Sequence, residues 1–223
     1  MRFTFSLPLI AVAALSATPA SAQSTAGARA AGDWLVRLRA ILVSPTERSG
    51  EVTGIAASKV GVNDSVMPEV DFTYLFTDHI GAELILATTK HDVTGRGAIA
   101  PLGKIADSWV LPPTLTLQYH FAPGGKIHPY VGAGVNYTIF YSSDSTKSLD
   151  AALGATKVRI GDSFGYALQA GVDLDIGRRL FLNADVKYID MDTTARLTSG
   201  TAKRSVRVNV DPVVAAVGIG VRF

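Results

Sequence analysis

The stretch that decides the fold runs from residue 164 to residue 174 and reads Phe-Gly-Tyr-Ala-Leu-Gln-Ala-Gly-Val-Asp-Leu. Its even-numbered positions are all apolar, whereas Gly165, Gln169 and Asp173 stand between them. Successive side chains of a β-strand leave opposite faces, so alternation with a period of two predicts a strand with one apolar and one polar face.

Seven other segments show the same alternation, and they lie at residues 34–42, 66–76, 80–86, 111–121, 131–141, 180–188 and 213–223. The connections between the eight segments are alternately short (77–79, 122–126, 176–179) and long (44–65, 89–107, 142–161, 190–205). An even number of strands with short turns at one end and long loops at the other is typical of bacterial outer-membrane barrels. The sequence therefore predicts an all-β protein, an eight-stranded antiparallel transmembrane β-barrel with short periplasmic turns and long extracellular loops.

A soluble eight-stranded barrel is the alternative, and it would turn the apolar face inward. Two features favour the membrane arrangement: the polar face mixes charges of both signs with glycines, and aromatic residues gather at both ends of the apolar face. Those aromatics are Tyr74, Phe76, Tyr119, Phe121 and Phe223 at the short-turn end, and Trp109, Tyr141, Phe164 and Tyr188 at the long-loop end. Two such belts match the two membrane–water interfaces.

The N-terminus has the composition of a secretory signal. Arg2 precedes an apolar run from Phe3 to Leu15, and Ala20-Ser21-Ala22 fits a cleavage site. We therefore expect residues 1–22 to be a signal peptide and residues 23–223 to form a single barrel domain. After the signal there is no apolar run of 18 residues and nowhere a cysteine, which argues against membrane helices and disulfides. The net charge of +2 argues against a nucleic-acid partner.

The polar face predicts the contents of the barrel interior. The residues expected to face the lumen are Arg37, Arg39, Glu69, Asp71, Glu83, Ile85, Gln118, His120, Asn136, Gln169, Asp173, Asp185, Lys187 and Arg222. Eight strands enclose a space only just wide enough for side chains, so the charges should pair as a plug.

Glycines on the same face leave a second possibility open, and they are Gly132, Gly134, Gly165, Gly171, Gly218 and Gly220. They either leave room or receive a large side chain such as Tyr130, Phe140 or Phe181. We expect a cavity towards the long loops. The apolar loop residues Ile99, Leu102, Ile105, Leu149 and Leu153 would line its mouth or simply pack the loops together.

One segment breaks the pattern. The apolar residues Val206, Val208 and Val210 are at even-numbered positions, whereas from Val213 onward the apolar residues are at odd-numbered positions. Proline cannot donate to a β-ladder, so a β-bulge near Asp211-Pro212 is predicted to reset the register.

Motifs with possible chemistry are weak. Gly161-Asp-Ser163-Phe-Gly165 matches the serine-hydrolase pattern, but that pattern needs a later histidine, and the last histidine is His128. The four histidines lack metal-ligand spacing, and Asp190-Met-Asp192 supplies too few oxygens for calcium. We expect no catalytic residue, no metal and no cofactor. Basic residues in the long connections could meet lipopolysaccharide phosphates: Lys90, Arg96, Lys104, Lys157, Arg159, Lys203 and Arg204.

Several strings of sequence in order resemble the OmpW family of eight-stranded outer-membrane proteins. They are Ser44-Pro-Thr-Glu47, Thr77-Asp-His-Ile-Gly-Ala-Glu-Leu84, Leu111-Pro-Pro-Thr-Leu115, Pro129-Tyr-Val-Gly-Ala-Gly-Val-Asn-Tyr137, Asp190-Met-Asp-Thr-Thr-Ala195, and Val210-Asp-Pro212 with the ending Arg222-Phe223. The resemblance implies a barrel that lets small, rather hydrophobic molecules across. This chain departs from the family where a tyrosine is usual at Val221 and an inward aromatic is usual near Lys187.

The predicted function is thus a narrow passive channel for small hydrophobic or amphipathic solutes in the cell outer membrane. The alternative is a structural or surface-interaction protein with a plugged lumen. Expected partners are outer-membrane lipid and lipopolysaccharide, small hydrophobic solutes, and the barrel-assembly machinery through the C-terminal strand.

Overall fold

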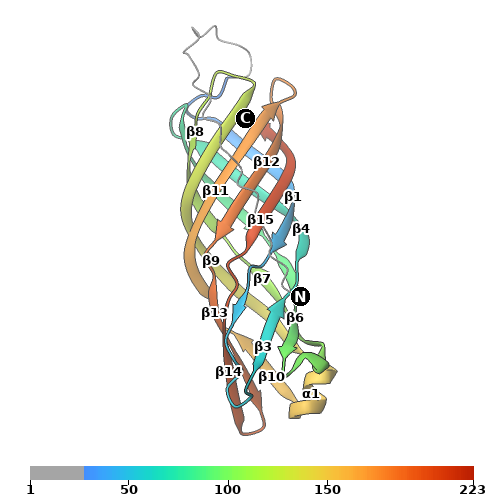
Figure 1. Cartoon of the computed structure of the whole chain (residues 1–223). Helices are drawn as coiled ribbons and strands as arrows, with labels where there is room; N and C mark the ends of the chain where they lie inside the picture. The colour runs from blue at the N-terminus through green and yellow to red at the C-terminus, as the bar shows by residue number, and fades with distance from the viewer. Residues whose placement is uncertain (1–27) are drawn as a thin grey trace, which may run out of the picture.

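The computed structural model describes residues 28–223, so the expected signal peptide lies outside the described residues. Eight strands form a closed antiparallel barrel (Figure 1). They are β1 (Trp34–Ser44), β4 (Ser65–Leu75), β5 (Ile80–Ala87), β8 (Thr114–His120), β9 (Ile127–Ser145), β11 (Ser163–Asp175), β12 (Leu180–Ile189) and β15 (Val213–Arg222). Neighbouring strands pair around the ring, β15 pairs with β1, and β9 pairs with β11 to close it.

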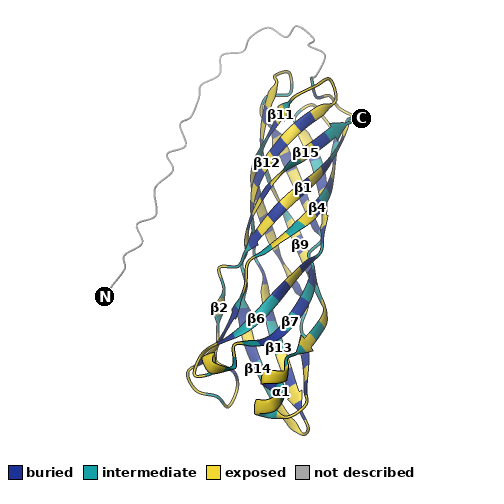
Figure 2. Ribbon diagram, turned by 90° about the vertical axis from the view of Figure 1, so that its right-hand side faces the viewer, coloured by how far each residue is buried: buried dark blue, intermediate teal, exposed yellow. Residues whose placement is uncertain are grey.

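The two faces of these strands differ as the alternation predicts. Leu117, Leu168 and Val217 stand on the outer face and are exposed, whereas Arg37 and Asp173 on the inner face are buried. Figure 2 shows exposed and buried residues alternating along the barrel strands. A closed ring leaves no unpaired strand edge, which is what a backbone in hydrocarbon requires.

The described residues contain no helix with both the length and the hydropathy needed to cross a bilayer.

The four long connections at the loop end contain regular structure that the sequence analysis did not anticipate. Their elements are β2 (Arg48–Ser49), β3 (Ser58–Val62), β6 (Thr89–Gly97), η1 (Ala100–Leu102), β7 (Lys104–Leu111), α1 (Lys147–Leu153), β10 (Thr156–Ile160), β13 (Asp192–Ser199) and β14 (Ala202–Asn209). Strands β7, β6 and β3 continue the sheet from the long strand β9, and β10, β13, β14 and β2 form a separate four-stranded sheet. Figure 1 shows these strands extending the barrel at the end opposite the short turns.

The predicted strand 111–121 is split in the structure. Leu111 ends β7, and β8 begins at Thr114, after Pro112 and Pro113. The ladder between β5 and β8 stops at Ile85–Thr114. Pairing resumes between β6 and β7 at residues 89 and 110. Proline has no N–H to donate, so two in succession interrupt the barrel wall at this height.

The predicted register reset near Asp211-Pro212 is wrong. The ladder is interrupted there, since β14 ends at Asn209, β15 begins at Val213, and Asp211 has a φ of 37°. Yet the even-numbered residues from Val206 to Ala216 are buried on both sides of the break. The even-numbered residues therefore face inward on both sides of the break. What changes there is the interior, which is apolar at the end with the long connections and polar inside the barrel.

Candidate functional site: a charged half and an apolar chamber

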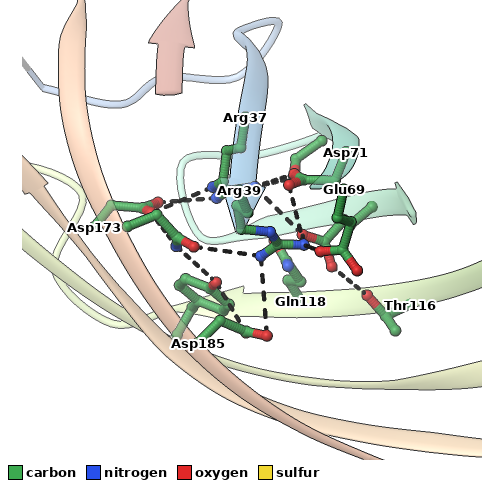
Figure 3. A network of polar contacts seen from close by, with 12 residues as sticks. Arg37, Arg39, Glu69, Asp71, Thr116, Gln118, Asp173 and Asp185 are labelled. Carbon is green, nitrogen blue, oxygen red and sulfur yellow. Dashed lines mark hydrogen bonds and ion pairs between the residues drawn. The ribbon is translucent and has the colours of Figure 1, made fainter. Parts of the chain in front are cut away.

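The barrel interior next to the short turns, here called the charged half, is organised around two arginines of β1 (Figure 3). Arg37 contacts Asp71 through Nη1 at 2.8 Å and Asp173 through Nη2 at 2.9 Å. Arg39 contacts Asp71 at 3.0 Å and Glu69 at 2.6 Å through Nη2. All of these side chains are buried. The two guanidiniums thus tie β1 to β4 beside it and to β11 across the interior.

Lys187 of β12 extends the network towards the loop end. Its Nζ lies 3.2 Å from Glu69 and 3.0 Å from Asp185. The position at which the family resemblance leads one to expect an inward aromatic therefore carries a buried ion pair.

Neutral side chains supply further hydrogen bonds to the buried carboxylates. Gln169 Nε2 donates to Glu83 at 2.9 Å, and Tyr130 Oη donates to Asp185 at 3.1 Å. Asn183 Nδ2 donates to Asp173 at 2.6 Å. A buried charge is tolerated when both an opposite charge and hydrogen bonds replace its lost water. The charged half has both, and its contacts cross the barrel interior, as Arg37 of β1 does to reach Asp173 of β11.

Arg29 belongs to this network, although the strand pattern did not reveal it. It precedes β1, is 3% exposed, and contacts Asp173 at 2.7 Å. Its guanidinium lies 4.9 Å from the centroid of the Phe181 ring. The charges of the predicted interior could have indicated a further base. They comprise five acids and four bases, and one of those bases, Arg222, lies at the rim.

Two of the six inward glycines receive aromatic side chains, whereas a Cβ at Gly134, Gly165 or Gly218 would meet the neighbouring backbone. A Cβ at Gly171 would overlap the ring of Tyr130, and a Cβ at Gly220 would overlap the ring of Phe181. Of the two alternatives that the sequence left open, these glycines therefore follow the second. Phe140 instead lines the cavity described below.

Of the other lumen residues named from the sequence, four are buried inside the barrel and one is only partly buried. Ile85 and Asn136 are buried inside, and Asn136 Nδ2 donates to Thr114 Oγ1 at 2.8 Å. Gln118 and His120 are also buried inside, with 3.1 Å between His120 Nε2 and Gln118 Oε1. Arg222 is only partly buried and donates to the Arg178 carbonyl at 3.0 Å.

The nine predicted interface aromatics are all exposed or partly exposed on the outer face. Some pair with one another, with ring centroids 5.3 Å apart for Tyr74 and Phe76 and 6.4 Å apart for Trp109 and Tyr141. Sequence reasoning missed Trp34 and Tyr166, which join the two groups through Tyr74 and Tyr188 at 5.0 and 6.0 Å.

Beyond the level of Glu69 and Lys187 the interior becomes apolar. A cavity of about 140 Å³, here called the apolar chamber, lies between the barrel and the sheets of the long connections. Its wall includes Val43, Phe140, Val158, Leu197, Val206, Val208 and Val210, together with all five apolar residues named from the long connections, Ile99, Leu102, Ile105, Leu149 and Leu153. The ion pair of Glu69 and Lys187 forms part of the lining where the chamber meets the charged half.

His91 on β6 is one of few polar groups in the chamber wall. Its Nδ1 lies 2.9 Å from the Asn63 carbonyl oxygen, and Nε2 lies 3.1 Å from Thr89 Oγ1. Burial lowers the pKa of His91, because the charged imidazolium loses its water. A neutral imidazole gives the chamber one polar contact without a fixed charge.

Residues of the two motifs considered for catalysis and for calcium binding make structural contacts. Ser163 begins β11, and its Oγ accepts from the backbone N–H of Asp192 at 3.0 Å. Met191 packs into the apolar cluster, and Asp192 accepts from Asn209. Within residues 28–223, no group of three or more histidine and acidic side chains could hold a metal ion.

A family model described as the OmpW family matches residues 30–223. The chain belongs to the OmpW family. It is 38% identical to outer membrane protein W of Escherichia coli K12 over 96% of this chain and 99% of the relative. It is 35% identical to the dibenzothiophene metabolism operon protein PahQ of Pseudomonas aeruginosa over 69% of each. The crystal structure of OprG from P. aeruginosa has a TM-score of 0.83 and 34% identity, covering 89% of this chain and 98% of that one.

This OmpW family member is therefore an outer-membrane β-barrel, and the cell outer membrane is its location. The apolar outer face of its eight strands meets lipid, and the charged half lies inside the membrane-spanning barrel. In bacterial outer-membrane barrels, the end with the long loops is the extracellular one.

Proposed function

We propose that the protein is a narrow passive channel that takes small hydrophobic or amphipathic solutes from outside into the apolar chamber. The observation that carries the proposal is the chamber itself, a space of about 140 Å³ walled by aliphatic side chains. Removing apolar surface from water is favourable by about 25 cal/mol per Å². Binding sites for small molecules are typically apolar with a few polar groups, and His91 and Thr89 supply such groups here.

The name of one relative supports this class of solute. PahQ is named for an operon of dibenzothiophene metabolism, and dibenzothiophene is a flat, apolar molecule. We propose the general class for this chain, small apolar or amphipathic compounds, and not that compound.

We further propose that the solute leaves through the barrel wall and not along the axis. The charged half fills the axis with paired, buried side chains. The wall is interrupted at Pro112 and Pro113. The ladder between β5 and β8 ends at the pair Ile85–Thr114, and the ladder between β6 and β7 begins at the pair Thr89–Val110. Between these two pairs, residues 86–88 are not paired with residues 111–113. Pro112 also lines the chamber, so the interruption adjoins the cavity.

The alternative is a structural or surface-interaction protein with a plugged lumen. The density of the ion-pair network favours it, since each buried cation of the charged half contacts at least one carboxylate. Under this alternative the chamber is only an imperfection in packing and no solute crosses.

A flux measurement with liposomes separates the two functions. Under the channel proposal, the refolded protein speeds the passage of a fluorescent apolar probe and gives no ion-current steps. Leu197→Trp fills the chamber and should lower the flux several-fold, whereas Val217→Trp, at a lipid-facing position 63% exposed, should not. Equal flux with wild type, Leu197→Trp and empty liposomes would leave the plugged-lumen function.

The sideways exit has its own test. The double variant Pro112→Val/Pro113→Thr restores two N–H donors where the ladder is interrupted, and should close the wall. Flux should then fall while binding of the probe to the chamber persists, as measured by fluorescence quenching. Unchanged flux would reject the wall as the exit but keep the chamber as the binding site.

A further inference from the structure

The outer face of the four-stranded sheet β10-β13-β14-β2 is strongly basic. Its exposed basic residues are Arg48, Lys157, Arg159, Arg196, Lys203 and Arg207. Adjacent residues on the same strands, such as Val158, Leu197 and Val208, are buried in the chamber wall. Because neighbours in a strand point to opposite faces, the six cations point away from the chamber into the surroundings.

Strand register brings these like charges together. Arg159 of β10 lies directly opposite Arg196 of β13. Arg207 of β14 is opposite Thr194, one step along the same face of β13. Like charges placed directly opposite each other destabilise a sheet. Repulsion between these cations therefore lowers the stability of the sheet unless an anion from outside the chain compensates their charge.

No direct ion pair within the described residues supplies such compensation. Across residues 28–223, no ion pair links any of these six cations to a carboxylate, although Asp192 lies on the same face and accepts from Asn209. On the sheet that continues from β9, Lys90 and Lys104 do pair with Asp107, at 3.6 and 3.0 Å. Arg96 pairs with Glu47 at 2.9 Å. The six cations of the basic face therefore remain available to an external anion.

A polar groove of about 400 Å³ lies at the base of this face. It is lined by Gly161, Asp162, Asp192, Thr193, Thr194, Arg196 and Arg207. Phe164, 71% exposed, follows only two residues after Asp162, and belongs to the aromatic belt that marks the membrane interface. The groove and its two arginines therefore stand immediately outside the hydrocarbon region, at the height of the lipid headgroups.

We propose that this basic face binds the phosphate groups of lipopolysaccharide, with Arg196 and Arg207 in the groove nearest the membrane. Lipopolysaccharide carries phosphates at this height on the extracellular side, and arginine recognises phosphate by paired hydrogen bonds. Of the loop bases named from the sequence, Lys157, Arg159 and Lys203 belong to the face. Lys90, Lys104 and Arg96 are paired elsewhere, and Arg204 lies opposite Leu197, on the other side of the sheet.

The test measures binding of purified lipopolysaccharide to the full-length, refolded protein in detergent. Arg196→Gln/Arg207→Gln should weaken binding about tenfold or more, since a basic residue at an anionic lipid surface contributes on the order of a factor of five to ten. The matched control is Lys90→Gln/Lys104→Gln, which also removes two cations but leaves the basic face intact; its affinity should stay within about twofold of wild type. Heat-dependent mobility in electrophoresis verifies that each variant is folded.

A second readout tests the like-charge argument. Without lipopolysaccharide, Arg159→Gln should leave the unfolding temperature unchanged or raise it, because repulsion from Arg196 is removed. With lipopolysaccharide, the same variant should gain less thermal stabilisation than wild type.

Two outcomes overturn the proposal. Equal affinity of the wild type for intact and enzymatically dephosphorylated lipopolysaccharide would show that phosphate is not what binds. Equally tight binding of a soluble polyanion such as heparin, abolished by Arg196→Gln/Arg207→Gln, would assign the face to an acidic polymer and not to the lipid.

Discussion

The two halves of the barrel interior share strands but not chemistry. Along the inner face of β1, Arg37 and Arg39 are followed by Ile41 and Val43, and all four are buried. The same change occurs on β12, from Asp185 and Lys187 to the apolar residues that follow. In the charged half the outer face meets lipid, so polar side chains go inward. Beyond the membrane the outer face meets water, so apolar side chains go inward, as in a soluble β-protein.

The comparison also explains how one strand pattern serves two tasks. In the charged half, paired charges and aromatic rings seated on glycines fill the interior. In the apolar chamber, aliphatic side chains have no strong directional contacts and leave a cavity of about 140 Å³. Under the proposed function, the charged half closes the barrel axis and the apolar chamber receives the solute.

The largest effect is expected from breaking the charged half. Arg37→Met leaves Asp71 and Asp173 buried without their shared cation. Removing one partner of a buried ion pair costs about 3–5 kcal/mol, because the remaining charge is uncompensated. We expect a loss of that size in the free energy of unfolding, measured by urea titration in lipid vesicles.

The control for this prediction is Arg48→Met at an exposed position of β2. It removes the same charge and adds the same side chain at the surface, and should change the free energy of unfolding by about 0.5 kcal/mol or less. Similar losses in both variants would mean that the charged half is wet and its charges are screened.

Sequence alone predicted the membrane part of the fold well. Alternation located all eight barrel strands, because their outer face must be continuously apolar. It failed beyond the membrane, where Val206, Val208 and Val210 are inward and the charged neighbours outward. Their even-numbered positions predict a register reset only if the outer face stays apolar along the whole strand, and beyond the membrane it does not.

The site was predictable only in part for a different reason. The alternation along each strand predicted that Arg37 and Asp173 face inward. Their contact joins residues 136 positions apart in the sequence, so it depends on barrel closure and on strand register. Arg29 lies before the first strand, where no periodicity constrains it. The cavity depends on how side chains from many elements pack, which a pattern of single strands does not encode.

A smaller loss is expected from carrying the chemistry of the charged half into the apolar chamber. In Val208→Glu the new carboxyl lies in a cluster of buried apolar side chains, with the neutral Thr193 and Ser49 opposite it, so its pKa should rise above the ordinary glutamate value of about 4.3. The unfolded chain then releases its proton first, and stability falls as the pH rises above about 4.3 until the folded-state pKa is passed. A rise of two units corresponds to about 2.7 kcal/mol.

Unfolding titrations between about pH 4 and 8 measure this slope relative to wild type. Val208→Gln is the matched control, since it is polar but does not ionise, and its loss should be independent of pH. A pH-independent loss in Val208→Glu as well would mean that water reaches the new carboxyl.

Packing in the charged half should be sensitive to a single methyl group. Gly171→Ala places a Cβ against the ring of Tyr130, which is held by its hydrogen bond to Asp185. Overpacking of this kind costs about 1–3 kcal/mol. Gly177→Ala is the control, because its nearest side-chain neighbour would be Leu180 Cβ at 3.6 Å, an ordinary contact. If the free energies of unfolding of both variants equal that of wild type, the interior is not closely packed.

The smallest effect should come from the polar group that the apolar chamber keeps neutral. Burial lowers the pKa of His91, so the unfolded chain binds a proton first as the pH falls below the ordinary histidine value of about 6.5. The stability linked to a neutral His91 is complete above that pH and is lost as the pH falls through the lower, folded-state pKa.

His91→Gln keeps a polar side chain but removes the titration, so its free energy of unfolding should depend less on pH between about 6.5 and 5 than that of wild type. If His91→Gln kept the full slope, the imidazole would be charged or solvated in the folded protein, and the chamber would be wetter than its aliphatic wall implies.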